Sequence, residues 1–167
     1  LTFDLEDWFH LLDHEPIRYP HQWERFESRV EKNVIALLEL LEHNDQRATW
    51  FCLGWVAERF PDLIRRVSEK HEIACHTYGH QLVYRQTREQ FREDATRAKS
   101  LLEDITGSPV HAFRAAGFSV DRRSPWFFEE LLAAGFTIDS SVYPGKRGHG
   151  GFPGFKSSEP CLIRTAN

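Results

Sequence analysis

The most specific chemical signal in this sequence is a pair of histidines, His76 and His80, in the segment HTYGH. Histidines four residues apart can face the same way on a helical turn and bind one metal ion together. Two neutral imidazoles and one carboxylate suit zinc, and they also suit cobalt, nickel or iron. The alternative is a surface turn with two incidental histidines, since the chain contains nine. The position of the pair directly after the apolar run EIAC favours metal binding.

Three acidic residues, Asp4, Glu6 and Asp7, lie close together in the segment TFDLEDWF. Side chains alternate between the two faces of a strand, so Asp4 and Glu6 point the same way if the strand persists. One would then act as a base and the other as a metal ligand. If the chain turns after Leu5, Asp7 becomes the ligand instead. The alternative for all three is an acidic loop that caps a following turn.

Two further polar residues, Arg114 and Asp139, stand at or near the ends of other apolar runs. Arg114 can hold Asp4 ionised and oriented, although a solvated or salt-bridged arginine is the more common case. Asp139 can serve in the same way. Its alternative is an Asx turn or cap with Ser140 and Ser141.

Aromatic residues are frequent near these run ends, and aromatic faces line sugar-binding grooves well. We expect Tyr78 and Trp55 to contact a substrate. Core packing is the default for most of the aromatic residues in this region, which include Trp8, Phe9, Trp50 and Phe118. Three other histidines have no clear partner and are predicted to face solvent: His10, His14 and His149.

The hydrophobic pattern supplies elements that can position these residues. Short apolar runs alternate with longer amphipathic stretches, which is typical of a parallel sheet or barrel. The predicted strands are 1–5, 47–54, 71–76, 110–117 and 136–142, with a further strand near 161–164. The predicted helices are 29–43, 60–70, 87–106 and 124–135, and Thr87 with Gln90 has the spacing of a capping box. Sites in parallel α/β folds form at the C-terminal ends of strands, where the candidate residues lie.

Length and composition limit the remaining alternatives. The chain has 167 residues, 41% of them hydrophobic and 28% charged, which is ordinary for one globular domain spanning 1–167. A closed eight-fold barrel needs roughly 200 residues or more, so we expect the barrel to be incomplete at the C-terminus. The formal net charge of -4 gives no reason to expect a nucleic acid partner. No apolar run approaches the roughly 18 residues that a membrane span requires.

The cysteines and the N-terminus bear on location. Cys52, Cys75 and Cys161 are odd in number, and the first two lie in apolar runs, which predicts buried free thiols for that pair. No signal peptide is recognisable in 1–167. These features favour a cytoplasmic location, with the cell envelope as the alternative, and they give no prediction of oligomeric state.

Taken together, the motifs resemble those of the polysaccharide deacetylase family, also called the NodB homology or carbohydrate esterase 4 family. The resemblance covers nearly the whole chain through TFDLEDWF, RATWFCLGW, HEIACHTYGH, FRAAGFS and IDSSVYP. More narrowly, the chain resembles the branch found at bacterial exopolysaccharide loci and the related peptidoglycan deacetylases and allantoinase-like proteins. The resemblance implies a distorted (β/α) barrel of the α/β class.

The resemblance also implies roles for individual residues. Asp4 is similar to the catalytic base, His76 and His80 to the histidine ligands of a divalent metal, and Arg114 to the residue that tethers the base. The family commonly has two adjacent aspartates at the first motif, whereas here Leu5 follows Asp4, so the third ligand is Glu6 or Asp7, with Glu6 favoured. The last family motif, a Leu-x-His segment that supplies a general acid, is absent from 1–167 and is expected beyond Asn167.

The function implied is metal-dependent removal of N-acetyl groups from an N-acetylated polysaccharide or peptidoglycan, with zinc as the favoured metal. Two alternatives stay open at this point. One is an allantoinase-like hydrolase that acts on a small cyclic amide. The other is a non-catalytic glycan-binding module that kept the fold but lost the acid.

Overall fold

Five short parallel strands form one sheet, in the order in which they occur along the chain. The computed structural model describes residues 1–12 and 14–165. The strands are β1 (Thr2–Leu5), β2 (Thr49–Cys52), β3 (Glu72–Cys75), β4 (Ala112–Phe113) and β5 (Ile138–Asp139). Each pairs in parallel with the next. The five strands lie within or match the predicted ones, although β4 and β5 are only two residues long.

Helices connect the strands and alternate with them along the chain. The longer ones are α2 (Val30–His43), α3 (Gly54–Arg59), α4 (Pro61–Ser68), α5 (Arg88–Thr106) and α6 (Phe127–Ala133). Shorter turns are α1 (Pro20–Trp23), η1 (Glu15–Ile17), η2 (Val83–Arg85) and η3 (Ala116–Phe118). The predicted helix 60–70 corresponds to α4, and α3 before it was not predicted.

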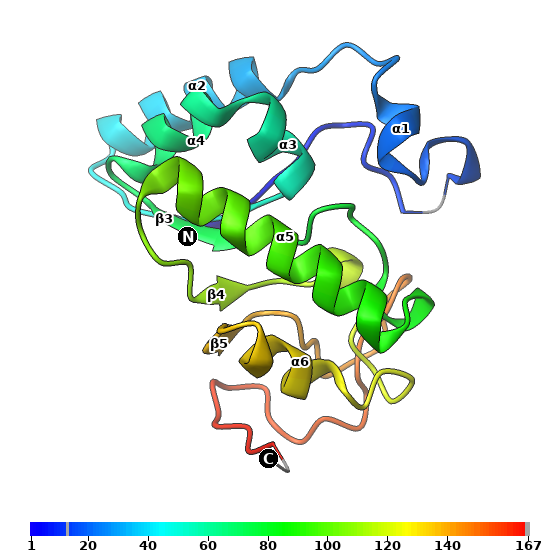
Figure 1. The fold of residues 1–167 in the computed structure, drawn as a ribbon. Coiled ribbons are helices and arrows are strands. Elements are labelled where there is room, and N and C mark those ends of the chain that lie inside the picture. The colour runs from blue at the N-terminus through cyan, green and yellow to red at the C-terminus, as the bar shows by residue number, and fades with distance from the viewer. Residues whose placement is uncertain (13, 166–167) are drawn as a thin grey trace.

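The longest helix, α5, has the boundaries that its sequence signals predict. Thr87 and Gln90 form a reciprocal capping box at its start. Gly107 ends it in the left-handed region, with φ of 66°, where a glycine has no side chain to clash. Figure 1 shows α5 running diagonally between β3 and β4, and the helix packs on β3, the central strand of the sheet.

The two faces of the sheet differ in their packing. Leu5, Cys52, Cys75 and Phe113 belong to the main core, which the helices cover (Figure 1). The opposite face carries a small apolar cluster of Phe51, Ala74 and Ala112. Helices on the outer face of sequentially ordered parallel strands are the arrangement of a β/α barrel wall. The sheet is open, with β1 and β5 at its two edges, so the predicted α/β fold with an incomplete barrel is confirmed.

The segment after Tyr143 contains no helix or strand as far as residue 165, which is the last described position. The strand predicted near 161–164 is therefore wrong. Pro160 lacks an amide donor for a sheet, and the side chain of Leu162 is 98% exposed. An apolar run without a buried face has little to stabilise it as a strand.

Cys52 and Cys75 are buried free thiols, as predicted, whereas the free Cys161 is exposed. Burial raises the pKa of both buried thiols. In the part of the chain that the structure describes, none of the helices combines the length and the hydrophobicity that crossing a bilayer requires.

Candidate active site

The register of the sheet aligns the candidate residues at one edge. A row of paired residues crosses all five strands where they end: Leu5, Cys52, Cys75, Phe113 and Asp139. The residues one position further along include Glu6, His76, Arg114 and Ser140. Backbone hydrogen bonds continue the ladder into this second row, since the amides of His76 and Arg114 each donate to a neighbouring strand at 2.9 Å. The C-terminal edge of the sheet therefore gathers these side chains, as predicted.

Glu6, His76 and His80 form a compact group with the chemistry of a metal site. One ligand atom from each lies within 4.8 Å of the others. Both histidines are buried, and His80 Nε2 lies 2.9 Å from Glu6 Oε2. This Glu6 oxygen is buried and has no hydrogen-bond partner among the described residues. A cation placed between these atoms would satisfy it, so the donor set fits a divalent ion of the zinc type.

The orientation of His76 is set by a backbone group on the next strand. His76 Nδ1 lies 2.7 Å from the carbonyl oxygen of Arg114. A carbonyl can only accept, so Nδ1 carries the proton and Nε2 keeps its lone pair. Burial lowers the pKa of His76, and the nearby His80 lowers it further, against the opposing carboxylates of Asp4 and Glu6. The ring is therefore neutral near pH 7 and able to act as a ligand.

The two histidines meet across a loop, whereas the sequence argument placed them on a helical turn. Residues 76–80 have no helical structure. Instead, Thr77 and His80 adopt left-handed backbone conformations, with φ of 64° and 51°. The Thr77 hydroxyl accepts the His80 amide at 3.1 Å. These bends bring the two ring centroids to 5.1 Å.

Asp7 lies outside the metal group because it has a different set of partners. Its carboxylate accepts hydrogen bonds from the Ser28 hydroxyl at 2.5 Å and from the amides of Arg29 at 3.0 Å and Val30 at 3.3 Å. It thus caps the start of α2 from more than 20 residues away. The chain does leave the strand after Leu5, yet Glu6 and not Asp7 joins the histidines. The structure in this respect corrects the expectation that a turn would make Asp7 the ligand.

Arg114 holds Asp4 on the same face of the sheet. Its Nη1 donates to Asp4 Oδ1 at 2.7 Å. Its Nη2 donates to Ser140 Oγ at 3.0 Å and to Thr2 Oγ1 at 3.2 Å. The guanidinium also stacks on the Phe51 ring, 3.9 Å from its centroid. The Asp4 carboxylate is thereby fixed beside the histidines while keeping 30% of its side-chain surface exposed.

Asp139 forms an Asx turn, which was one of its two predicted roles. Its carboxylate accepts from the Ser141 hydroxyl at 2.5 Å and the Ser141 amide at 3.1 Å. The Ser141 hydroxyl in turn accepts the amide of Ala115 at 2.8 Å. Burial raises the pKa of Asp139 to about 6, although the bonds from Ser141 and the charge of Arg114 act in the opposite direction. Asp139 therefore braces the chain just after Arg114 through Ser141.

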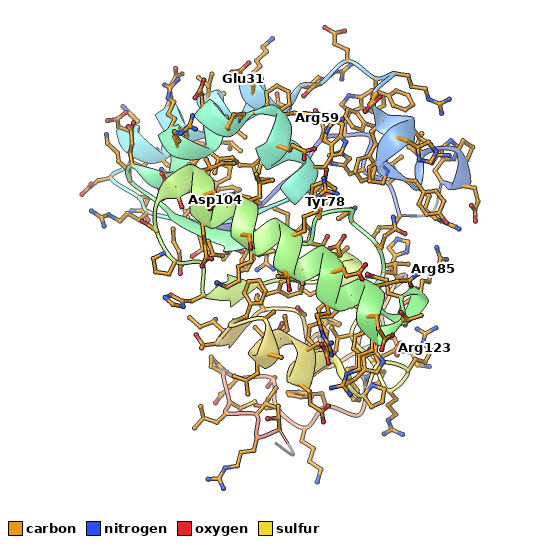
Figure 2. All side chains as sticks on the ribbon, viewed as in Figure 1. Glu31, Arg59, Tyr78, Arg85, Asp104 and Arg123 are labelled. Carbon is orange, nitrogen blue, oxygen red and sulfur yellow. The ribbon has the colours of Figure 1, made fainter. Side chains whose placement is uncertain are left out.

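Tyr78 and Trp55 are not placed to bind a sugar, contrary to the prediction. Their exposed fractions are 9% and 4%. The Tyr78 hydroxyl donates to Glu58 at 2.7 Å, and Arg97 covers its ring at 3.5 Å. Arg59 covers Trp55 at 3.9 Å. Figure 2 shows Tyr78 and Arg59 where α3 faces α5, so both rings are buried between helices and their side chains.

His10 lies beside the metal group, whereas the sequence analysis predicted that it faces solvent. It is 4% exposed, and its ring centroid lies 6.2 Å from that of His80. Its Nδ1 accepts the Asp7 amide at 2.9 Å. Burial lowers the pKa of His10 to about 2, and His80, His76 and Arg59 act in the same direction. Its place in the aromatic run DWFH was the one signal of burial. Of the other two, His14 is exposed as predicted and His149 is partly buried.

Comparison with known proteins gives consistent matches. The family model described as polysaccharide deacetylase matches residues 20–137, which include His76, His80 and Arg114 but not Asp4 or Glu6. Two curated relatives, both peptidoglycan-N-acetylglucosamine deacetylases of Bacillus cereus, are 25% identical over 112 and 121 residues. The matches cover 65% and 69% of this chain, but 41% and 44% of the relatives. The chain thus spans less than half the length of the curated relatives it matches.

Solved structures show the same fold. A protein from Mycobacterium smegmatis assigned to the polysaccharide deacetylases has a TM-score of 0.70 and 25% identity, over 91% of this chain and 55% of its own. A structure described as a CE4 family pseudoenzyme from Bacillus anthracis has a TM-score of 0.60 and 16% identity, over 65% and 38% of the two chains. At that identity the second likeness concerns the fold alone.

Proposed function

This chain belongs to the polysaccharide deacetylase family, and on that premise we propose that it removes N-acetyl groups from a glycan by metal-assisted hydrolysis. The observation that carries the proposal is the convergence of Glu6, His76 and His80 beside an Asp4 that Arg114 holds in place. A structural role alone gives no reason for a Glu6 oxygen that makes no hydrogen bond within the described residues and faces two buried histidines.

Glu6, His76 and His80 are proposed to hold a divalent metal, with zinc favoured by the two imidazoles and one carboxylate. When bound, such an ion acts as a Lewis acid that polarises the acetyl carbonyl and acidifies water. The hydrogen bond from His76 to the Arg114 carbonyl keeps the ligand nitrogen of the ring unprotonated. Both histidines are buried, whereas the Glu6 and Asp4 side chains each keep 30% of their surface exposed, so the group opens to solvent on the carboxylate side.

Asp4 is proposed to be the general base. Water adds to the acetyl carbonyl carbon while Asp4 takes one of its protons. The bond between that carbon and the amide nitrogen then breaks, which releases acetate and leaves a free amine on the sugar. The amine must gain a proton as it leaves, which requires a general acid in addition to Asp4. Arg114 keeps Asp4 oriented through the 2.7 Å bond to Oδ1.

The substrate class follows from the relatives. The curated proteins matched act, by their names, on N-acetylglucosamine in peptidoglycan. We therefore propose an N-acetylglucosamine-containing glycan, either peptidoglycan or another bacterial polysaccharide. The presence of Asp4 next to the metal group favours hydrolysis over simple glycan binding.

The test compares the wild-type chain with a His76→Ala/His80→Ala double variant. We expect the wild type to bind one zinc ion per chain and the double variant to bind none, as measured by elemental analysis after dialysis. Acetate release from N-acetylglucosamine oligomers is then measured against release of product from small cyclic amides. Metal binding without turnover of either substrate would indicate a glycan-binding module. Absence of metal from the wild type after reconstitution would overturn the proposal.

A further inference from the structure

The loop that carries both histidines is held in an unfavourable backbone shape. Thr77 and His80 have positive φ values, and they are two of the four non-glycine residues with this property in the described chain. Such conformations cost about 1 kcal/mol or more each and persist only when surrounding contacts impose them. Because each lies at or next to a proposed ligand, the contacts that impose them also determine where the imidazoles point.

One side chain from α5 supplies the main polar contact to the middle of this loop. Asp94 Oδ2 accepts the amide of Tyr78 at 2.7 Å, and Asp94 Oδ1 accepts the amide of Gly79 at 2.8 Å. The two oxygens thus bind two successive amides between His76 and His80. Burial raises the pKa of Asp94, while the two amide donors act in the opposite direction. Successive backbone N–H groups can together bind one anion, and here the two amides bind the two oxygens of one carboxylate.

The rest of the loop is held from α3. The carbonyls of Thr77 and Tyr78 accept the amides of Gly54 and Trp55 at 2.8 and 3.2 Å. The Tyr78 side chain is pinned through Glu58, which also binds Arg97 of α5 at 3.0 Å. Figure 2 shows Tyr78 in this position between the two helices. The loop is therefore held through two carbonyls by α3 and through two amides by Asp94 of α5. Asp94 is the contact that a single side-chain substitution can remove.

We propose that Asp94 is a positioning residue of the metal centre, which sets metal affinity by holding the His76–His80 loop through two backbone amides. The inference rests on the proposed function, since it assumes that His76 and His80 bind a metal. Asp94 itself is not a member of the metal group. It acts on His80 through the backbone of Tyr78 and Gly79.

An amide side chain cannot replace this carboxylate. Asparagine has nearly the same shape, but one of its two terminal atoms is an NH2 group, which would face a backbone N–H. One hydrogen bond is lost and a donor is set against a donor, so the loop must shift. Residues that orient metal ligands from outside the first shell typically change metal affinity by about 10–100-fold when altered.

The test measures the zinc dissociation constant of the wild type, Asp94→Asn and Asp94→Ala by competition with a chromophoric chelator. Glu130→Gln is the control, because Glu130 is a buried carboxylate held by two side chains of α5, Arg88 and Arg92, but it lies in α6. We expect both Asp94 variants to bind zinc about 10–100-fold more weakly. Glu130→Gln should lower the melting temperature and leave the zinc constant unchanged.

Three results would overturn the inference, each in a recognisable way. Wild-type affinity in a folded Asp94 variant would show that the loop does not need the carboxylate. An equal loss of affinity in Glu130→Gln would show that general destabilisation is responsible. If the wild type itself binds no zinc, the proposed function fails and the role of Asp94 fails with it. Should one Asp94 variant not fold, as judged by circular dichroism, the other carries the comparison.

Discussion

The backbone carbonyl of Arg114 accepts a hydrogen bond from His76 Nδ1 at 2.7 Å, across 38 residues of sequence. The side chain of the same Arg114 holds Asp4, also at 2.7 Å. Arg114 therefore binds the proposed base, Asp4, through its side chain and a proposed metal ligand, His76, through its main chain. Substitutions of this residue leave the carbonyl in place, so the two functions can be separated by experiment.

Replacing Arg114 with lysine should lower kcat/KM and spare metal binding. Lysine keeps the charge, but it cannot hold Asp4, Ser140 and Thr2 together through two nitrogens. A base displaced by about 1 Å costs roughly 100-fold in rate. Steady-state deacetylation and zinc competition would be measured on the same preparation. A variant that loses zinc but keeps turnover per bound zinc would contradict this prediction.

Replacing Asp4 with asparagine should remove the general base without disturbing the ligands. General base catalysis typically raises the rate by about 10²–10⁴-fold, so we expect kcat to fall by about 100-fold or more. The zinc content should stay at the wild-type level, because Asp4 is not part of the ligand group. Residual activity equal to wild type in acetate-release assays would rule out Asp4 as the base.

Glu6→Gln should lower the zinc affinity, whereas Asp7→Asn should lower the stability of the fold. Glu6→Gln removes a charged ligand, so its zinc affinity should fall by more than the roughly 10–100-fold typical of residues that merely orient ligands. Asp7→Asn weakens the cap on α2, so its free energy of unfolding should fall by about 1 kcal/mol. Zinc titration and urea denaturation of both variants would check this. Zinc loss in the Asp7 variant alone would exchange the two roles.

Gly54→Ala should disturb the metal loop from the side of α3. A Cβ atom at Gly54 would lie 2.7 Å from Tyr78 Cδ2 and 3.0 Å from Tyr78 Cα, so the loop backbone must move. We expect a loss of about 1–3 kcal/mol in unfolding free energy, together with weaker zinc binding. Gly148→Ala is the matched control, since its Cβ would have no atom within 4 Å. Equal stability and zinc affinity in the two variants would refute the steric argument.

Asp139 should give stability a pH dependence of known sign. Its folded-state pKa is raised to about 6, above the unfolded value of about 3.9. Its contribution is therefore complete below pH 4 and is lost as the pH rises through 6. Asp139→Asn cannot titrate, so the unfolding free energy of wild type minus variant should fall between pH 4 and pH 6.5. Urea denaturation across this range provides the measurement, and a flat or rising difference would contradict the pKa shift.

Much of the fold and part of the site could be predicted because strand ends are visible in the sequence. The apolar runs before Glu6, His76 and Arg114 stop at those polar residues, and parallel pairing in register carries His76 and Arg114 to one edge. The capping residues of α5 are local as well, so its boundaries were predictable. Pro61 at the first position of α4 is a local signal for the break from α3 as well. The exposure of Leu162, which leaves 161–164 without a strand, depends on packing that no local pattern describes.

The sequence by itself determined which residue types stand at the strand ends and in what order, because that information lies in periodicity and spacing. Only the tertiary structure placed Glu6, and not Asp7, in one group with the two histidines, and it buried Tyr78, Trp55 and His10. The physical reason is that side-chain direction is set by alternation only while the strand lasts. After Leu5, the direction of each side chain depends on which unsatisfied amides and apolar surfaces the packed helices present. Those partners, such as the first amides of α2 for Asp7, come from distant parts of the chain.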